Sequence, residues 1–152
     1  MDFVLRLPWL SDWVVRLHSA DEDVAPPPSL PCLTVVNTGY SSGPGEHYVS
    51  YAVAGSDPAP ASVTYFDSFG VPPYDRLLEH WRRCGWRTVR YSERCLQDPG
   101  SDACALYQMT FAAFAGVDYG FRPFLALFDP RDTALNDRLV AEFVLHVDET
   151  YL

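Results

Sequence analysis

Lysine is absent from this sequence of 152 residues, and positive charge of any kind is scarce. All 11 basic residues are arginine, against 20 aspartates and glutamates, which gives a net charge of −9 at pH 7. Binding nucleic acid without regard to its sequence requires a clustered positive surface. We therefore expect no nucleic-acid partner, and we expect the acidic surface mainly to favour solubility.

The sequence also lacks any C-x-x-C pair. Its four cysteines are Cys32, Cys84, Cys95 and Cys104. Because tetrahedral zinc sites are usually built from closely spaced cysteine pairs, we expect no metal, and nothing in the sequence suggests an organic cofactor.

A long apolar run is missing from the first residues, MDFVLRLPWLSDW, which include Asp2 and Pro8. This segment fits neither a secretory signal nor a membrane span. We therefore expect an intracellular protein with no membrane partner and with reduced thiols.

The 48% of apolar residues suits one globular domain over residues 1–152. Residues 1–31 are expected to form an N-terminal helix, capped by Ser11 and running through Leu17, and then a proline-rich connector. Residues 116–152 are expected to cover the domain, with a last helix capped by Asp132 or Thr133.

The middle of the chain predicts an α+β fold. Three short strands in succession, which imply an antiparallel meander, are separated by a glycine- and serine-rich turn and by a turn with Gly55, Asp57 and Pro58. Two helices and a fourth strand follow. The expected strands are 32–37, 47–53, 62–66 and 87–91, and the expected helices are 74–83 and 104–115.

The stretch QDPGSDACALYQMTF, from Gln97 to Phe111, changes from a polar loop to an apolar segment with helical spacing. Cys104 should therefore lie in the first turn of a buried helix. There the free backbone N–H groups and the helix dipole favour a thiolate, which is the nucleophilic form of cysteine. The alternative is a structural thiol that packs as a small apolar group, as we expect for Cys32, Cys84 and Cys95.

A thiol nucleophile needs a base, a group that orients the base, and donors for an oxyanion. His47 begins one predicted strand and Asp67 ends the next, so the two could lie side by side as base and orienting acid. Gln97, seven positions before Cys104, could donate to an oxyanion together with the Cys104 N–H. Taken singly, the alternatives are a surface histidine, a turn-forming aspartate and a solvated glutamine. The remaining histidines, at positions 18, 80 and 146, are expected at the surface.

These residues occur in the same order as in a known family. Three segments resemble the adenovirus endopeptidases (adenain type), which are related to the ubiquitin-like-protein (SUMO) proteases: TVVNTGYSSGPGEHYVSYAV, TYFDSFGVPP and QDPGSDACALYQMTF. The resemblance implies a papain-like α+β fold, with an antiparallel sheet packed on a central helix and a catalytic core over 32–115. It also implies a base at His47, an orienting acid at Asp67, a nucleophile at Cys104 and an oxyanion donor at Gln97.

The sequence departs from that family at three positions near the expected site. Tyr48 replaces the usual tryptophan after the histidine and could wall a narrow substrate channel. Ala105 replaces the usual glycine after the nucleophile, so its methyl group could crowd the thiol. Asp102 adds a negative charge that by itself would raise the pKa of Cys104.

The resemblance implies a thiol endopeptidase, in the first place a viral or virus-like protease that matures precursor proteins, cutting after small residues. It would work in the host cytoplasm or nucleus, or in a virion. The alternatives are an isopeptidase that removes ubiquitin-like modifiers and a non-catalytic module that binds peptides in the same groove. Adenain is activated by a disulfide-linked peptide, but neither Cys84 nor Cys95 lies at the matching distance from Gln97, which leaves an activating peptide as an open question.

Overall fold

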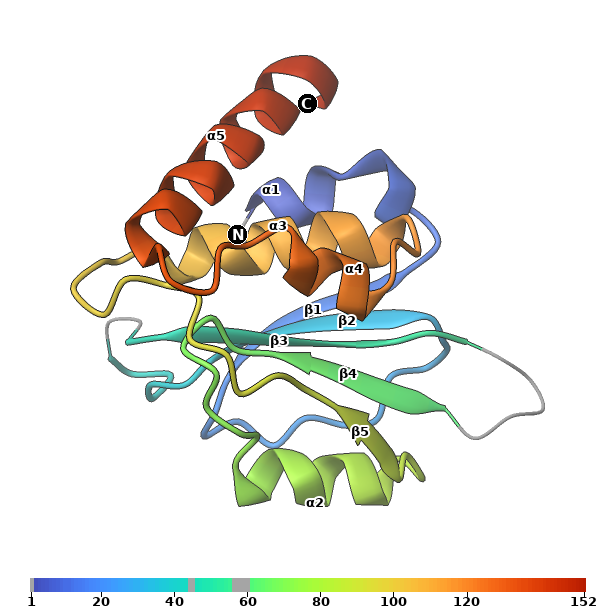
Figure 1. Cartoon of the computed structure of the whole chain (residues 1–152). Helices are drawn as coiled ribbons and strands as arrows, with labels where there is room; N and C mark the ends of the chain where they lie inside the picture. The colour runs from blue at the N-terminus through green and yellow to red at the C-terminus, as the bar shows by residue number, and fades with distance from the viewer. Residues whose placement is uncertain (1, 44–45, 56–60) are drawn as a thin grey trace.

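The computed structural model describes residues 2–43, 46–55 and 61–152, and a five-stranded sheet lies at its centre between helices (Figure 1). The glycine-rich turn at residues 44–45 and the expected turn at Asp57 and Pro58 lie outside the described residues. The elements are α1 (Asp2–Arg6), a short 3-10 helix (Pro8–Leu10), β1 (Val14–Ser19), β2 (Cys32–Asn37), β3 (Tyr48–Val53), β4 (Ser62–Phe66), α2 (Asp75–Arg83), β5 (Thr88–Arg90), α3 (Cys104–Gly116), α4 (Phe121–Ala126) and α5 (Thr133–Tyr151).

The sheet has the strand order β1-β2-β3-β4-β5. The predicted antiparallel meander is confirmed for β2, β3 and β4. The expectation of an entirely antiparallel sheet is wrong, because β1 runs parallel to β2 and β5 runs parallel to β4. Each of these parallel pairs needs a connection long enough to return the chain to the same end of the sheet. Residues 20–31 provide one such connection, and α2 with its flanking loops provides the other.

The N-terminal helix expected from Ser11 through Leu17 is also wrong. Val14–Ser19 forms β1 instead, with α1 and the 3-10 helix before it. Valine side chains at positions 14 and 15 favour extended backbone, and pairing with β2 satisfies the backbone groups along one edge of the strand. The pairing partner, which the local pattern did not reveal, decides the outcome.

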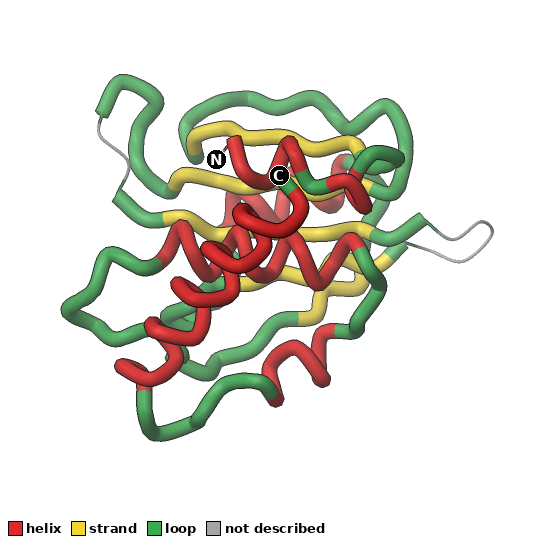
Figure 2. Tube along the Cα trace, turned by 90° about the horizontal axis from the view of Figure 1, so that it is seen from above, coloured by secondary structure: helices red, strands yellow, loops and turns green. Residues whose placement is uncertain are grey.

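Both faces of the sheet are covered, and each face has its own core. α2 packs Leu77 and Trp81 against Tyr51 and Tyr65 on one face. The remaining helices cover the other face, as the view from above shows (Figure 2). Because successive side chains of a strand point to opposite faces, β3 contributes Tyr51 to the α2 side and Ala52 to the α3 side.

The bounds predicted for α2, β5 and α3 are confirmed within a residue or two. The last helix is confirmed at its start, where Asp132 caps α5 by accepting the N–H of Leu135, and it continues to Tyr151. The short helix α4 was not expected. Two predictions of burial are wrong: His80 is buried instead of exposed, and Cys95 is exposed instead of buried. Within the described ranges, no helix is both long and apolar enough to cross a membrane.

Candidate active site

A tight turn at the end of β4 fixes the position of Asp67. The Asp67 carboxylate accepts the backbone N–H of Phe69 at 2.8 Å, and the Asp67 carbonyl accepts the N–H of Gly70 at 3.0 Å. Gly70 has a φ of +73°, and a Cβ atom there would lie 2.6 Å from the Glu93 backbone. Only glycine suits this position, because an L side chain would be strained and would push away the segment that leads to Gln97.

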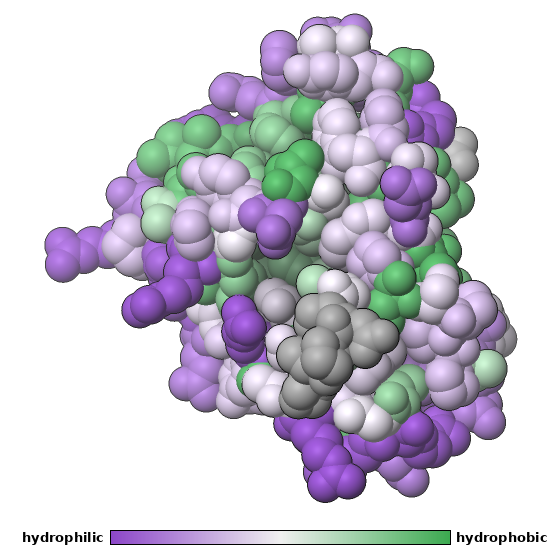
Figure 3. Space-filling view, turned by 90° about the vertical axis from the view of Figure 1, so that its right-hand side faces the viewer, coloured by the Kyte–Doolittle hydropathy of each residue, from purple (hydrophilic) through white to green (hydrophobic). Residues whose placement is uncertain are grey.

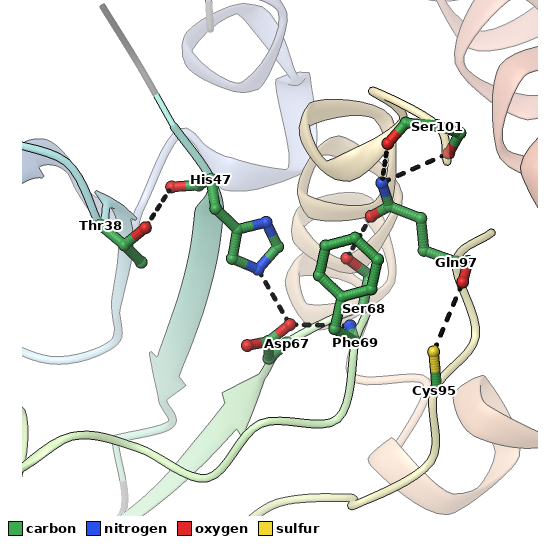
Figure 4. Close-up of polar contacts among 8 residues, drawn as sticks. All are labelled: Thr38, His47, Asp67, Ser68, Phe69, Cys95, Gln97 and Ser101. Carbon is green, nitrogen blue, oxygen red and sulfur yellow. Dashed lines mark hydrogen bonds and ion pairs between the residues drawn. The ribbon is translucent and has the colours of Figure 1, made fainter. Parts of the chain in front are cut away.

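His47 immediately precedes β3, and the end of β2 holds it in place. The carbonyl of His47 accepts hydrogen bonds from the Thr38 N–H at 2.8 Å and from the Thr38 hydroxyl at 3.2 Å. The ring Nε2 lies 3.0 Å from Asp67 Oδ1, and the ring packs against Phe69 at a centroid distance of 5.0 Å (Figure 4). Since Nε2 faces Asp67, Nδ1 is the ring nitrogen left to face another partner.

Cys104, the first residue of α3, lies near enough to this ring for each group to shift the pKa of the other. Burial opposes a charge on the His47 ring, but hydrogen bonding to Asp67 and then to Cys104 raises the pKa of His47 to about 9. Burial likewise opposes a thiolate, yet the hydrogen bond with His47 and the backbone N–H groups of Tyr48 and Ala105 lower the pKa of Cys104. A thiolate and an imidazolium therefore stabilise each other at this point.

The other three thiols have the opposite tendency. Burial raises the pKa of Cys32 to about 12 and raises the pKa of Cys84. The pKa of Cys95 is also raised, by burial and then by the carboxylates of Asp67, Asp137 and Asp98. Of the four cysteines, Cys104 alone has a lowered pKa.

Gln97 is almost fully enclosed, with 1% of its surface exposed. Its Oε1 accepts the hydroxyl of Ser68 at 2.7 Å, and its Nε2 donates to the Ser101 carbonyl at 2.8 Å and to the Ser101 hydroxyl at 3.3 Å (Figure 4). The carbonyl of Ser68 also accepts the backbone N–H groups of Leu96 and Gln97. The side-chain amide is thus held at the loop that enters α3.

Sequence reasoning missed the residues that hold this loop. The Leu96 carbonyl accepts both the Tyr107 hydroxyl at 2.9 Å and the Asn136 side-chain amide at 3.1 Å. The Asp137 carboxylate accepts the Tyr107 hydroxyl at 2.9 Å and the Asp98 N–H at 3.3 Å. In the sequence, each of these residues is only a polar position within an apolar helical pattern. Such a pattern does not reveal which group the polar side chain contacts.

The three positions that depart from the family pattern lie around the thiol. Tyr48 begins β3 and is half-buried, and its backbone N–H helps to lower the pKa of Cys104. The backbone N–H of Ala105 lowers the pKa of Cys104 in the same way. Asp102 is exposed, and the pKa of Cys104 is lowered instead of raised, so the stabilising groups outweigh any repulsion by that carboxylate.

A cavity of about 480 Å³ lies near the other end of α3, away from Cys104. Phe111, Phe114, Phe121 and Phe124 form much of its wall. Figure 3 shows the face that carries it, where apolar residues surround a hollow. Among the described residues, no group of three or more His, Cys, Asp or Glu side chains is arranged to hold a metal ion.

A central five-stranded sheet packs against a helix that begins at Cys104, and a solved protease shares this mixed α+β fold. Among solved structures it is similar to the ASFV pS273R protease, with a TM-score of 0.51 and 18% sequence identity. The match covers 72% of this chain and 42% of that one, so the chain spans less than half of that protease. No protein-family model and no curated protein match the sequence. The likeness shows a shared fold and does not single out the adenain type.

Proposed function

We propose that this protein is a thiol endopeptidase in which Cys104, His47 and Asp67 form the catalytic triad. One observation carries the proposal: the only thiol with a lowered pKa lies beside an imidazole whose other nitrogen is 3.0 Å from a buried carboxylate. This arrangement activates a cysteine for attack on a carbonyl group. The fold shared with the ASFV pS273R protease adds support.

In the proposed reaction, the Cys104 thiolate attacks the scissile carbonyl and forms a carbon–sulfur bond. The oxyanion that results is stabilised by the backbone N–H of Cys104 and by Gln97, whose Nε2 turns from Ser101 towards it. The carbon–nitrogen bond then breaks, and the amine leaves with the proton of His47. Water, deprotonated by His47, hydrolyses the thioester and regenerates the thiol. Asp67 keeps the imidazole oriented throughout. No metal or organic cofactor takes part in this scheme.

We propose precursor proteins as the substrates of a viral or virus-like maturation protease of the adenain type. Tyr48, at the start of β3 beside Cys104, supports a narrow channel that accepts small residues next to the cleaved bond. The proposed setting is inside a cell or a virion, because the chemistry requires a reduced Cys104. Cleavage by the purified protein alone would show that it needs no activating peptide.

Two other functions use the same groove and are distinguished by reagents. An isopeptidase for ubiquitin-like modifiers should be labelled rapidly by an active-site-directed ubiquitin or SUMO probe, and a precursor protease should not. A non-catalytic peptide-binding module should show no preferential alkylation of Cys104. A catalytic Cys104 should react faster than Cys32, Cys84 and Cys95, and it should lose this advantage in His47→Ala.

The decisive experiment is mass spectrometry of a peptide library incubated with the purified protein and with Cys104→Ala. We expect new peptide ends with the native protein and none with the variant, whose fold should persist by circular dichroism. Gln97→Ala should slow cleavage by roughly a hundredfold to a thousandfold, because one oxyanion donor is lost. A Cys104→Ala protein that cleaves the same bonds would end the assignment.

A further inference from the structure

A buried polar group lies one helical turn beyond Cys104. Gln108 is 0% exposed, and neither its Oε1 nor its Nε2 has a hydrogen-bond partner among the described residues. Ser50 of β3 is also 0% exposed, and its hydroxyl likewise has no partner there. An unpaired buried polar group destabilises a fold, so most such groups in proteins bond to protein or to ordered water.

From the packing of α3 on β3 we infer that Gln108 lies over Ser50. The backbone N–H of Tyr48 lowers the pKa of Cys104, so the starts of the two elements lie close together, and Ala112 and Ala52 belong to the core on the same face of the sheet. Four helical residues advance by about 6 Å and two strand residues by about 6.6 Å, so the two elements keep step. Gln108 therefore meets β3 at the next residue on the same face, which is Ser50.

The neighbours of Ser50 on the sheet agree with this placement. Ser50 lies opposite Val35 on β2 and opposite Phe66 on β4, and both of these side chains are apolar. The Phe66 ring contacts Tyr107 and Phe111 of α3, which flank Gln108 in the helix. A partner for the Ser50 hydroxyl must therefore come from α3 or from a molecule enclosed between helix and sheet.

We propose that one enclosed water molecule bridges the side-chain amide of Gln108 and the hydroxyl of Ser50. Such a water accepts from Gln108 Nε2 or donates to Gln108 Oε1, and it pairs with Ser50 Oγ in the same way. The site joins the helix that begins at Cys104 to the strand that follows His47. If the proposed function holds, Gln108 and Ser50 are positioning residues that fix the separation of thiol and imidazole.

A crystal structure of the full chain tests the site directly. We expect a solvent peak within hydrogen-bond distance of Gln108 and Ser50. A structure with no solvent between them, in which the amide bonds to another group, overturns the proposal. This measurement needs no catalytic activity, so a failure of the protease assignment would not change what the solvent peak shows.

A double-mutant cycle tests whether the two residues are coupled. Gln108→Met and Ser50→Ala should each lower the melting temperature by about 3 to 6 °C, because each leaves the other polar group with fewer partners. The double variant should be more stable than the sum of the two effects predicts. Thr110→Val is the matched control, since its hydroxyl bonds to the Leu106 carbonyl of its own helix at 2.8 Å. The effects of Thr110→Val and Ser50→Ala on the melting temperature should simply add in the double variant. If the effects of Gln108→Met and Ser50→Ala add in the same way, the proposed bridge is wrong.

The positioning role has its own readout. In Gln108→Met, the pH at which Cys104 becomes alkylated should rise, whereas in Thr110→Val it should stay where it is in the native protein. An unchanged alkylation profile in Gln108→Met, together with a solvent peak in the native crystal structure, overturns the positioning role and leaves the water site standing.

Discussion

At the scale of single residues, the site depends on how the charge of the His47 ring is stabilised by Asp67 and Cys104. Asp67 is 4% exposed and lies 3.0 Å from His47, and Cys104 faces the same ring from α3. The raised pKa of His47 means that the imidazolium contributes stability in full below its ordinary value of 6.5. This contribution is lost as the pH rises through about 9.

The first prediction concerns pH. Peptide cleavage should decline as the pH rises through about 9, because His47 must carry a proton to the leaving amine. Alkylation of Cys104 by iodoacetamide should persist above that pH, because it requires only the thiolate. In Asp67→Asn the upper limit of cleavage should move down by about one to three pH units, since the neighbouring negative charge is gone. Parallel pH profiles of cleavage and alkylation check this, and a common decline of both would contradict it.

The second prediction compares two serines that contact Gln97. Ser68→Ala leaves the buried Oε1 of Gln97 without its 2.7 Å donor, whereas Ser101→Ala removes two long contacts, from Gln97 Nε2 at 3.3 Å and from the Ala103 N–H at 3.4 Å, and keeps the 2.8 Å bond to the Ser101 carbonyl. Ser68→Ala should therefore cost about 1–3 kcal/mol of unfolding free energy and slow cleavage by roughly tenfold or more. Ser101→Ala should cost less than about 1 kcal/mol. Urea unfolding and cleavage rates measure both, and equal effects of the two variants would contradict the roles given to them.

At the scale of elements, the short turn after β4 positions two parts of the candidate site. It orients Asp67 through Phe69 and, through Ser68, anchors the segment that holds Gln97. The turn therefore joins the acid on β4 to the loop before α3. The same turn brings Gly70 against the Glu93 backbone.

The third prediction separates two glycines with left-handed backbone. Gly70 and Gly85 have φ of +73° and +80°, but a Cβ atom at Gly85 would meet nothing within 4 Å. Gly85→Ala should cost about 1–2 kcal/mol for its backbone conformation alone. Gly70→Ala should cost about 4 kcal/mol or more and impair cleavage, because the Gln97 segment must move. Thermal unfolding of the two variants checks the difference, which should vanish if the close approach to Glu93 is unimportant.

At the scale of the whole molecule, the sheet separates two cores with different chemistry. The core under α3 bears the candidate site, whereas the core under α2 encloses His80 among aromatic rings. Burial and the positive charges of Arg83, His18 and Arg16 lower the pKa of His80. His80 is therefore neutral in the folded protein at a pH where the unfolded chain would bind a proton.

The fourth prediction follows from the lowered pKa of His80. The unfolded chain protonates His80 near its ordinary value of 6.5, so the folded protein should lose stability as the pH falls below about 6.5. His80→Phe keeps a ring beside Tyr51 and Trp86 and removes the titration. Between about pH 7 and pH 5, the melting temperature of His80→Phe should fall less than that of the native protein. Equal pH dependence in the two proteins would show that His80 does not contribute.

Local patterns of residue type predicted most of the helices and strands that form the fold. The apolar periods of residues 74–83 and 104–115 and the β-branched runs at 32–37 and 62–66 predicted the elements that form. Patterns of this kind also marked His47, Asp67, Gln97 and Cys104 as candidates and set their order along the chain. They failed at β1, at the direction of both edge strands, at the burial of His80 and at the exposure of Cys95, because each depends on partners distant in sequence.

The sequence alone determined which chemical groups are available and where α2, α3, α5 and the central strands begin, since these follow from side-chain type and spacing. Only the tertiary structure decided which groups meet. Tertiary packing lowers the pKa of one thiol among four, pairs the Gln97 amide with Ser68 and Ser101, and buries both Gln108 and Ser50. These outcomes depend on distances of a few ångströms between residues far apart in the chain, and local pattern does not encode such distances.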